Sequence, residues 1–117
     1  FDGVIDNFSI YANKIAVIKE TYSEIYRVLK KKGFFFSKVW GTKTQGYKIG
    51  KKLEFNTFDK IKIGPCKNMG VSHFFSYKEL KNLNKIYRSN LIDKNYYSDK
   101  SVNRKYFVEI FISQSYK

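Results

Sequence analysis

The stretch YRVLKKKGFFFSKVW, residues 26–40, decides the fold of this chain. Its first residues end an apolar pattern with helical spacing, and its last seven form an almost unbroken apolar run. Three lysines and Gly33 separate the two parts. Cations complement the negative end of a helix dipole, and glycine is the usual left-handed residue just past a helix. The stretch therefore predicts a helix that ends near Leu29, a left-handed Gly33 and a strand over Phe34–Trp40.

The residues before this stretch predict a first strand and the body of the helix. Residues 1–5 form a short apolar run with β-branched members, which is typical of a buried strand. Asn13 is placed to cap the helix. Five apolar residues then follow at spacings of three and four, namely Ile15, Ile18, Tyr22, Ile25 and Leu29. Strand, helix and strand in this order predict a β-α-β unit, and the apolar second strand predicts burial on both of its faces.

Residues 41–70 differ from the rest of the chain, because they hold five of the seven glycines and the only proline. We expect an irregular insertion there, with a short strand at about residues 60–63. Loops of this length are usually functional or mobile. We favour a lid over an active site. The alternative is a surface for single-stranded nucleic acid, because aromatic residues alternate with lysines: Tyr47, Lys48, Lys51, Lys52, Phe55, Phe58 and Lys60.

Regular structure is predicted to return at a second helix. Ser76 and Glu79 have the spacing of a capping box, and Phe75 with Leu80 has the spacing of a hydrophobic staple. The inner face of this helix is expected to carry Leu80, Leu83 and Tyr87.

Two strands are predicted to close the chain. Residues 91–97 and 106–113 are the strand candidates, and the polar turn between them covers residues 99–104. Strands joined by a short polar turn pair as an antiparallel hairpin. The whole chain is therefore expected to be α/β.

The charge is strongly positive, with 23 Lys and Arg against 10 Asp and Glu and a net charge of +13. Such a charge attracts nucleic acid and anionic membranes. The lysines are scattered, however, and Lys30 to Lys32 form the only run, so a biased genome composition explains them equally well. A basic nucleic-acid-binding module without catalysis stays open as an alternative function.

Cysteine and histidine usage excludes several kinds of site. Cys66 is the only cysteine, so neither an intrachain disulfide nor a cysteine metal cluster is possible. One histidine without ligand spacing predicts no metal site. Cys66 has no identifiable activating base in the sequence, so we expect no nucleophilic role for it. Its single thiol fits a reducing compartment, and we expect a cytoplasmic protein. No apolar stretch approaches the roughly 20 residues of a membrane span.

Four passages resemble the C-terminal half of a class I S-adenosylmethionine-dependent methyltransferase, whose Rossmann-like seven-stranded sheet ends in an antiparallel strand pair. FDGVI at residues 1–5 looks like the family's fourth strand. Residues 26–35 look like its R-V-L-K-P-G-G passage, with Lys31 and Lys32 in place of the proline and first glycine. Residues 73–80 look like its F-[ST]-x-x-E-[LI] helix start, and residues 106–112 look like its closing strand. The resemblance implies methyl transfer to a small-molecule acceptor, with residues 1–117 as one partial domain.

The parts of the family that grip the cofactor are not visible in this sequence. The family's Gly-rich loop follows its first strand, and no G-x-G occurs here. We therefore expect residues 1–117 alone to bind S-adenosylmethionine weakly or not at all. Because Phe1 already lies inside an apolar run, we expect the cofactor half upstream of it. Without that half an exposed sheet edge would favour a homo-oligomer or pairing with another chain, even as a non-catalytic half-domain.

Candidate site residues follow from the end of the first strand. Ligands of open α/β sheets bind beyond the carboxyl ends of the strands. Asp6, Asn7 and Phe8 leave the first strand at that end, and the resemblance places them near the cofactor's methionine part. The alternative is that they only build the turn. Tyr11 and Trp40 are candidate acceptor-binding residues, with plain packing as the alternative.

His73 is the only histidine, and it precedes the second helix. Its ordinary pKa suits a proton acceptor, so we consider it both a catalytic and a substrate-binding candidate. A packing or capping role is the alternative.

Overall fold

The computed structural model describes residues 1–102 and 104–117, and the side chains of residues 1–98 and 106–117. Four strands form a mixed sheet in the order β1-β2-β7-β6. Their bounds are Gly3–Asn7 for β1, Phe34–Trp40 for β2, Arg104–Tyr116 for β7 and Ser89–Val102 for β6. β1 and β2 are parallel, whereas β7 is antiparallel to both of its neighbours. The predicted α/β class, β-α-β unit and closing hairpin are confirmed.

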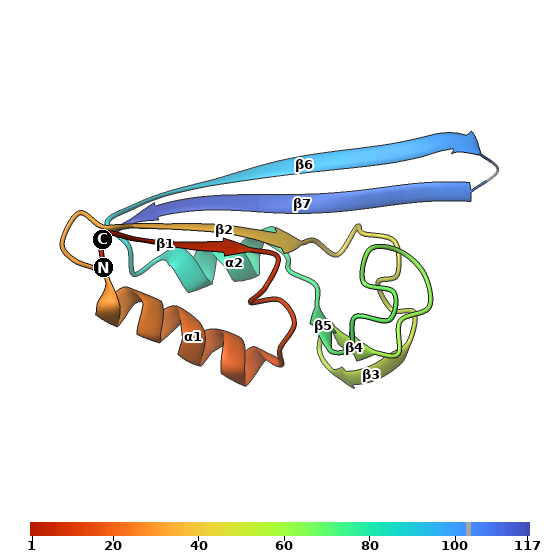
Figure 1. The fold of residues 1–117 in the computed structure, drawn as a ribbon, viewed down its shortest axis with the longest axis horizontal. Helices are drawn as coiled ribbons and strands as arrows, with labels where there is room; N and C mark the ends of the chain where they lie inside the picture. The colour runs from red at the N-terminus through yellow and green to blue at the C-terminus, as the bar shows by residue number, and fades with distance from the viewer. Residues whose placement is uncertain (103) are drawn as a thin grey trace.

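Two helices, α1 (Ile15–Val28) and α2 (Tyr77–Asn84), lie on the same face of this sheet (Figure 1). The apolar stripe of α1 faces the sheet, and the Tyr22 ring meets the edge of the Phe35 ring at 5.3 Å between centroids. Phe35 also packs against Tyr87, just after α2, at 6.2 Å. Phe35 therefore joins both helices to β2, and its side chain is fully buried.

The opposite face of the sheet is uncovered. β2 buries Phe35 and Val39 on the helix side, but Phe34 is 40% exposed and Ile5 of β1 is 69% exposed. The prediction that β2 is buried on both faces is therefore wrong. Both helices of the described residues pack on one side, so the apolar run of β2 has a partner on one side only.

The start of α1 differs from the prediction. Asn13 does not cap the helix; its side-chain amide donates to the Ile10 carbonyl instead. Lys14 is the N-cap and offers no side-chain bond. The acceptor comes from the insertion, because the Glu54 carboxylate accepts a 2.7 Å hydrogen bond from the Ile15 N–H. A negative group at a helix N-terminus also complements the helix dipole.

The end of α1 corrects a second prediction. Lys32, not Gly33, is the left-handed residue, with φ of 67°. Gly33 is needed for a different reason. A Cβ there would lie 2.8 Å from the Lys30 carbonyl oxygen and 3.1 Å from that of Asp2. Close approach of three backbone segments therefore selects glycine at this position.

Part of the insertion forms strands β3 and β4, which pair with β5 just after it in a small antiparallel sheet beyond the carboxyl end of β2 (Figure 1). The strands of this sheet are Lys51–Glu54, Thr57–Asp59 and Ser72–His73. The predicted strand at residues 60–63 is absent, and the short strands of the insertion lie at 51–54 and 57–59 instead. The rest of residues 41–70 is turns and irregular segments. The left-handed φ of 54° at Asn56 makes the β3–β4 turn, and the same angle at Lys60 ends β4.

The second helix begins largely as predicted. The Ser76 hydroxyl accepts from the Glu79 N–H at 3.1 Å, and both Phe75 and Leu80 are buried. In a complete capping box the Glu79 side chain would also accept a hydrogen bond from the Ser76 backbone N–H. Here the Glu79 carboxylate bonds to His73 instead.

The closing hairpin is longer than predicted. β6 and β7 cover both predicted strands and continue through most of the predicted turn at residues 99–104, with Val102 opposite Arg104. Residue 103 of that turn lies outside the described residues. Backbone pairing does not need apolar side chains, so polar residues extend these strands beyond β2. No helix in the described part of the chain is long and apolar enough to cross a membrane.

Candidate active site at the strand ends

Asp6 lies at the carboxyl end of β1 and is 4% exposed. One carboxylate oxygen accepts hydrogen bonds from the Ser9 and Ile10 N–H groups at 2.9 and 3.0 Å. The other accepts a 2.7 Å bond from the Ser37 hydroxyl. Ser37 is the register partner of Asp6 on β2. Both oxygens are thus engaged within the chain, and Asp6 closes the turn that follows β1.

Asn7 and Phe8 complete this end of the strand. Asn7 is exposed. Phe8 is left-handed, with φ of 55°, an uncommon conformation for a bulky residue. Its N–H donates to the Lys38 carbonyl at 3.2 Å, and its ring stacks on Trp40 at 4.3 Å with an interplanar angle of 22°.

Tyr11 completes an aromatic cluster, which we define as Phe8, Tyr11 and Trp40. The Tyr11 ring meets Trp40 edge-on at 6.5 Å, and Tyr11 is 4% exposed. Burial raises the pKa of the Tyr11 hydroxyl, so the hydroxyl is neutral at pH 7. The aromatic cluster joins three of the predicted site residues at the ends of β1 and β2.

His73 is tied to the same place through its backbone, because its N–H donates to the Tyr11 carbonyl at 2.8 Å. Its ring is 1% exposed. Nδ1 lies 2.7 Å from the Thr57 hydroxyl, and Nε2 lies 2.7 Å from the Glu79 carboxylate. His73 thereby joins β4 and β5 to α2. A role as proton acceptor stays a prediction, since it requires one of these two bonds to open.

Sequence reasoning missed the residues that hold these side chains. Ser37 carried a signal, because it is the one hydroxyl in the apolar run FFFSKVW. Thr57 carried none, since the pairing of Thr57 with His73 across β4 and β5 depends on a register that the sequence does not show. Glu79 was found as a helix cap, but its bond to His73 was not.

The aromatic residues of the insertion form its own core. The Tyr47 ring contacts Phe58 and Phe74, each at 5.6 Å, and its hydroxyl donates to the Asn56 side chain. Phe58 is 4% exposed, whereas Phe55 is 74% exposed. Of the three aromatic residues considered for nucleic-acid stacking, only Phe55 is largely exposed to solvent. Across the described residues, no group of three acidic, histidine or cysteine side chains is placed to hold a metal ion.

Comparisons with known proteins bear on the fold. No protein-family model and no curated protein matches the sequence. A SAM-dependent methyltransferase from Methanosarcina mazei matches 98% of this chain and 59% of its own, with a TM-score of 0.64 and 18% identity. The Burkholderia thailandensis 1,6-didemethyltoxoflavin-N1-methyltransferase matches 100% of this chain and 44% of its own, with a TM-score of 0.56 and 14% identity. The latter structure holds 1,6-didemethyltoxoflavin and S-adenosylhomocysteine.

The chain thus spans about half the length of these two proteins. At such identities the likeness establishes fold alone. The reversed β7 beside two parallel strands is the ending expected of a class I methyltransferase sheet. The chain has the fold of the C-terminal half of a class I methyltransferase-like domain.

Proposed function

We propose that residues 1–117 form the acceptor side of an S-adenosylmethionine-dependent methyltransferase that acts on a small molecule. The supporting observation is the sheet order β1-β2-β7-β6 with the aromatic cluster at the carboxyl ends of its two parallel strands. Ligands of open α/β sheets bind at those ends. The small acceptor of the Burkholderia protein supports the same acceptor class.

The residues present do not fit the cofactor by themselves. The Asp6 carboxylate is occupied by Ser9, Ile10 and Ser37, which leaves exposed Asn7 as the polar side chain at the end of β1. The sequence has no G-x-G turn for the cofactor. Cofactor binding by the intact enzyme therefore requires residues outside 1–117, with Asn7 and Phe8 as the contacts that this half adds.

Tyr11 and Trp40 have a different role in this proposal. They form a rigid wall beside the acceptor, and the insertion above the strand ends limits access of water. Methyl transfer is in-line, so alignment of the acceptor is the main contribution of such a wall. His73 would accept a proton from the acceptor at Nδ1 once its bond to the Thr57 hydroxyl opens, because the Nε2 that faces the Glu79 carboxylate carries its own hydrogen.

A partner segment is part of the same proposal. β1 is an edge strand, and exposed apolar residues surround it, with Phe1 at 71% and Ile5 at 69% exposure. An open edge beside an uncovered apolar face favours addition of a further strand. The segment would come from the same polypeptide, a second copy or another chain. The single thiol of Cys66 supports a cytoplasmic site for the enzyme.

Calorimetric titration of two polypeptides tests the proposal. One is residues 1–117 and the other is the longest natural polypeptide that contains them, each titrated with S-adenosylmethionine and S-adenosylhomocysteine. We expect micromolar binding by the longer polypeptide and none by residues 1–117. Asn7→Ala should weaken binding by the longer polypeptide several-fold, whereas Asp2→Ala at an exposed position should not.

Two results would overturn parts of this proposal. Micromolar binding by residues 1–117 alone would remove the need for a second half. A longer polypeptide that binds neither compound would remove the methyltransferase function.

A further inference from the structure

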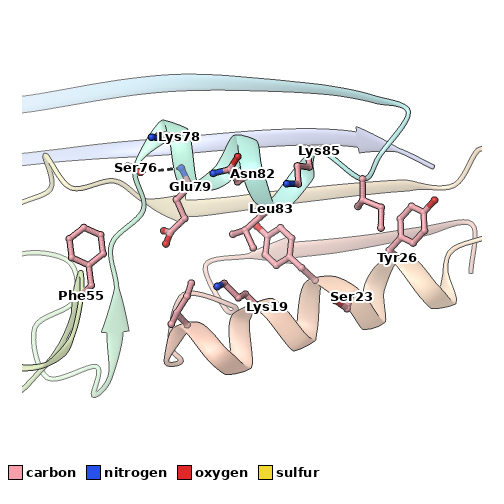
Figure 2. A pocket seen from close by; sticks show the side chains of 13 residues that line it. Lys19, Ser23, Tyr26, Phe55, Ser76, Lys78, Glu79, Asn82, Leu83 and Lys85 are labelled. Atoms are coloured by element: carbon pink, nitrogen blue, oxygen red, sulfur yellow. Dashed lines mark hydrogen bonds between the residues drawn. The ribbon is translucent and has the colours of Figure 1, made fainter.

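A trough of about 710 Å³ runs between α1 and α2, away from the strand ends (Figure 2). On α1 its wall comprises Ile15, Lys19, Tyr22, Ser23 and Tyr26, which lie on one helical face. Phe55 from the β3–β4 turn lies at one end of the trough. The other wall comprises α2 and its flanks, through Ser76, Lys78, Glu79, Asn82, Leu83, Lys85 and Ile86.

The floor of the trough is apolar and in part exposed to solvent. Ile86 is 57% exposed and Phe55 is 74% exposed, although both are large apolar side chains. Leu83 and Tyr26, which also line the trough, are half-buried. Contiguous exposed apolar surface with a polar rim marks interaction sites on soluble proteins.

Charge on the trough is one-sided. Lys19, Lys78 and Lys85 are exposed along it. Glu79 is the one acid among the described residues that line it, and its carboxylate is bonded to His73. The acidic side chains of α1, Glu20 and Glu24, line a different cavity on the other side of the helix. Arg27 lies on that other side too, where it pairs with Glu24. The acids of α1 therefore do not neutralise the lysines of the trough.

We propose that this trough binds an amphipathic α-helix whose apolar stripe is flanked by acidic residues. Two helical walls about an open apolar floor are the geometry in which a third helix packs, with anchors at i, i+3, i+4 and i+7. From Ile15 to Tyr26 the wall is about 16 Å long, which suits three helical turns. The lysine rim and the net charge of +13 select an acidic partner.

A small amphiphilic acid is the other occupant to consider. Pockets for small molecules usually enclose 70–90% of the ligand, as a general estimate. In this trough, by contrast, the large apolar side chains of Ile86 and Phe55 are mostly exposed to solvent, so the trough does not enclose a ligand. The observations therefore favour the helix. The inference is independent of methyl transfer, because neither the aromatic cluster nor His73 lines the trough.

Fluorescence anisotropy of a dye-labelled designed peptide tests the inference with residues 1–117. The probe is a peptide of about 14 residues with leucines at helical spacing and glutamates elsewhere. A second peptide carries the same residues with the leucines scattered around the helix. We expect saturable binding of the amphipathic peptide only, at least about tenfold tighter than binding of the scattered one.

Three variants locate the binding. Lys19→Glu with Lys85→Glu should weaken binding at least about tenfold. Lys62→Glu with Lys67→Glu is the matched control; it changes net charge equally at exposed positions of the insertion and should weaken binding no more than about twofold. Ile86→Ser should also weaken binding, with the fold checked by circular dichroism.

Equal weakening by both lysine pairs would overturn the inference, since it would show attraction by net charge alone. Equal binding of the two peptides would do the same. If neither peptide binds but decanoate binds saturably, and Ile86→Ser abolishes that binding, the trough is a site for a small amphiphile instead. None of these outcomes depends on binding of S-adenosylmethionine.

Discussion

The strand ends and the helix trough are opposite kinds of surface. At the strand ends Asp6 has three hydrogen-bond donors from the chain itself, and the rings of Phe8 and Trp40 stack on each other, although the buried Nε1 of Trp40 has no hydrogen-bond partner among the described residues. In the trough the chain leaves apolar side chains such as Ile86 exposed beneath free lysine ammonium groups. The Asp6 carboxylate has used its bonding capacity within the fold, whereas the lysine ammonium groups of the trough have not.

The two regions contribute differently: residues at the strand ends stabilise the fold, whereas residues of the trough are available for binding. A buried carboxylate with three donors holds β1, β2 and the following turn together, so a change there affects the fold before it affects any ligand. Exposed trough residues contribute little to folding and can be changed almost freely. Under the proposed function the strand ends need further residues to complete a cofactor site, whereas all the lining residues of the trough belong to this chain.

The largest expected effect comes from breaking the closed region. Asp6→Ala leaves two backbone N–H groups and the Ser37 hydroxyl without their acceptor. An unsatisfied buried group costs about 1–3 kcal/mol, so we expect a loss of about 3 kcal/mol in the free energy of unfolding. Urea denaturation followed by circular dichroism measures it.

Asp6→Asn and Asp2→Ala are the matched variants. Asparagine retains an oxygen for Ser9 and Ile10, and its amide can donate to the Ser37 oxygen, so about 1 kcal/mol should be lost. The Asp2 side chain is 92% exposed, with Lys30 at 3.7 Å, and its removal should change stability by less than about 0.5 kcal/mol. Equal losses for Asp6→Ala and Asp2→Ala would refute the description of the strand ends as a closed network.

The elements that the sequence predicted best are those with strong local periodicity. The stripe from Ile15 to Leu29 and the run Phe34–Trp40 gave the β-α-β unit, because spacing alone separates helix from strand there. Ser76 capped α2 as predicted, since a capping box is a local pattern.

The errors arose where distant segments decide local structure. The cap of α1 comes from Glu54 and not from Asn13, and Glu54 is 39 residues from Ile15, whose N–H donates to it. The strands of the insertion lie at 51–54 and 57–59 instead of 60–63, because Asn56 and Lys60 adopt left-handed angles that asparagine tolerates and lysine rarely shows. No sequence rule would have placed a left-handed residue at Lys60.

The candidate site was predicted in position more than in role. Phe8, Tyr11 and Trp40 do gather at the strand ends, because the carboxyl ends of parallel strands share one edge of the sheet. The sequence could not show that the Asp6 carboxylate bonds to Ser37, because that contact depends on the strand register. The trough was not predicted at all, because it needs the spacing between two helices that are distant in sequence.

A smaller effect is expected at the bond between the insertion and α1, which lies between the two regions. Glu54→Ala removes the acceptor for the Ile15 N–H and the negative charge at the helix N-terminus. Loss of a cap costs about 1 kcal/mol. Glu20→Ala, at an exposed position later in α1, should cost less than half of that. The comparison is made by urea denaturation; an equal loss in both variants would show that Glu54 does not cap the helix.

The smallest expected effect is in the trough itself. Ile86→Ser removes a side chain that is already 57% exposed, so its burial contributes little to folding, and we expect a change of no more than about 0.5 kcal/mol. Ile18→Ser is the contrasting variant: Ile18 is fully buried on α1, and a polar residue there should cost about 3 kcal/mol or more. Thermal and urea unfolding of both variants sharpens the distinction between the regions. If Ile86→Ser destabilises the chain as much as Ile18→Ser, then Ile86 is part of the core, and the trough is a flaw in packing with no free surface to offer a partner.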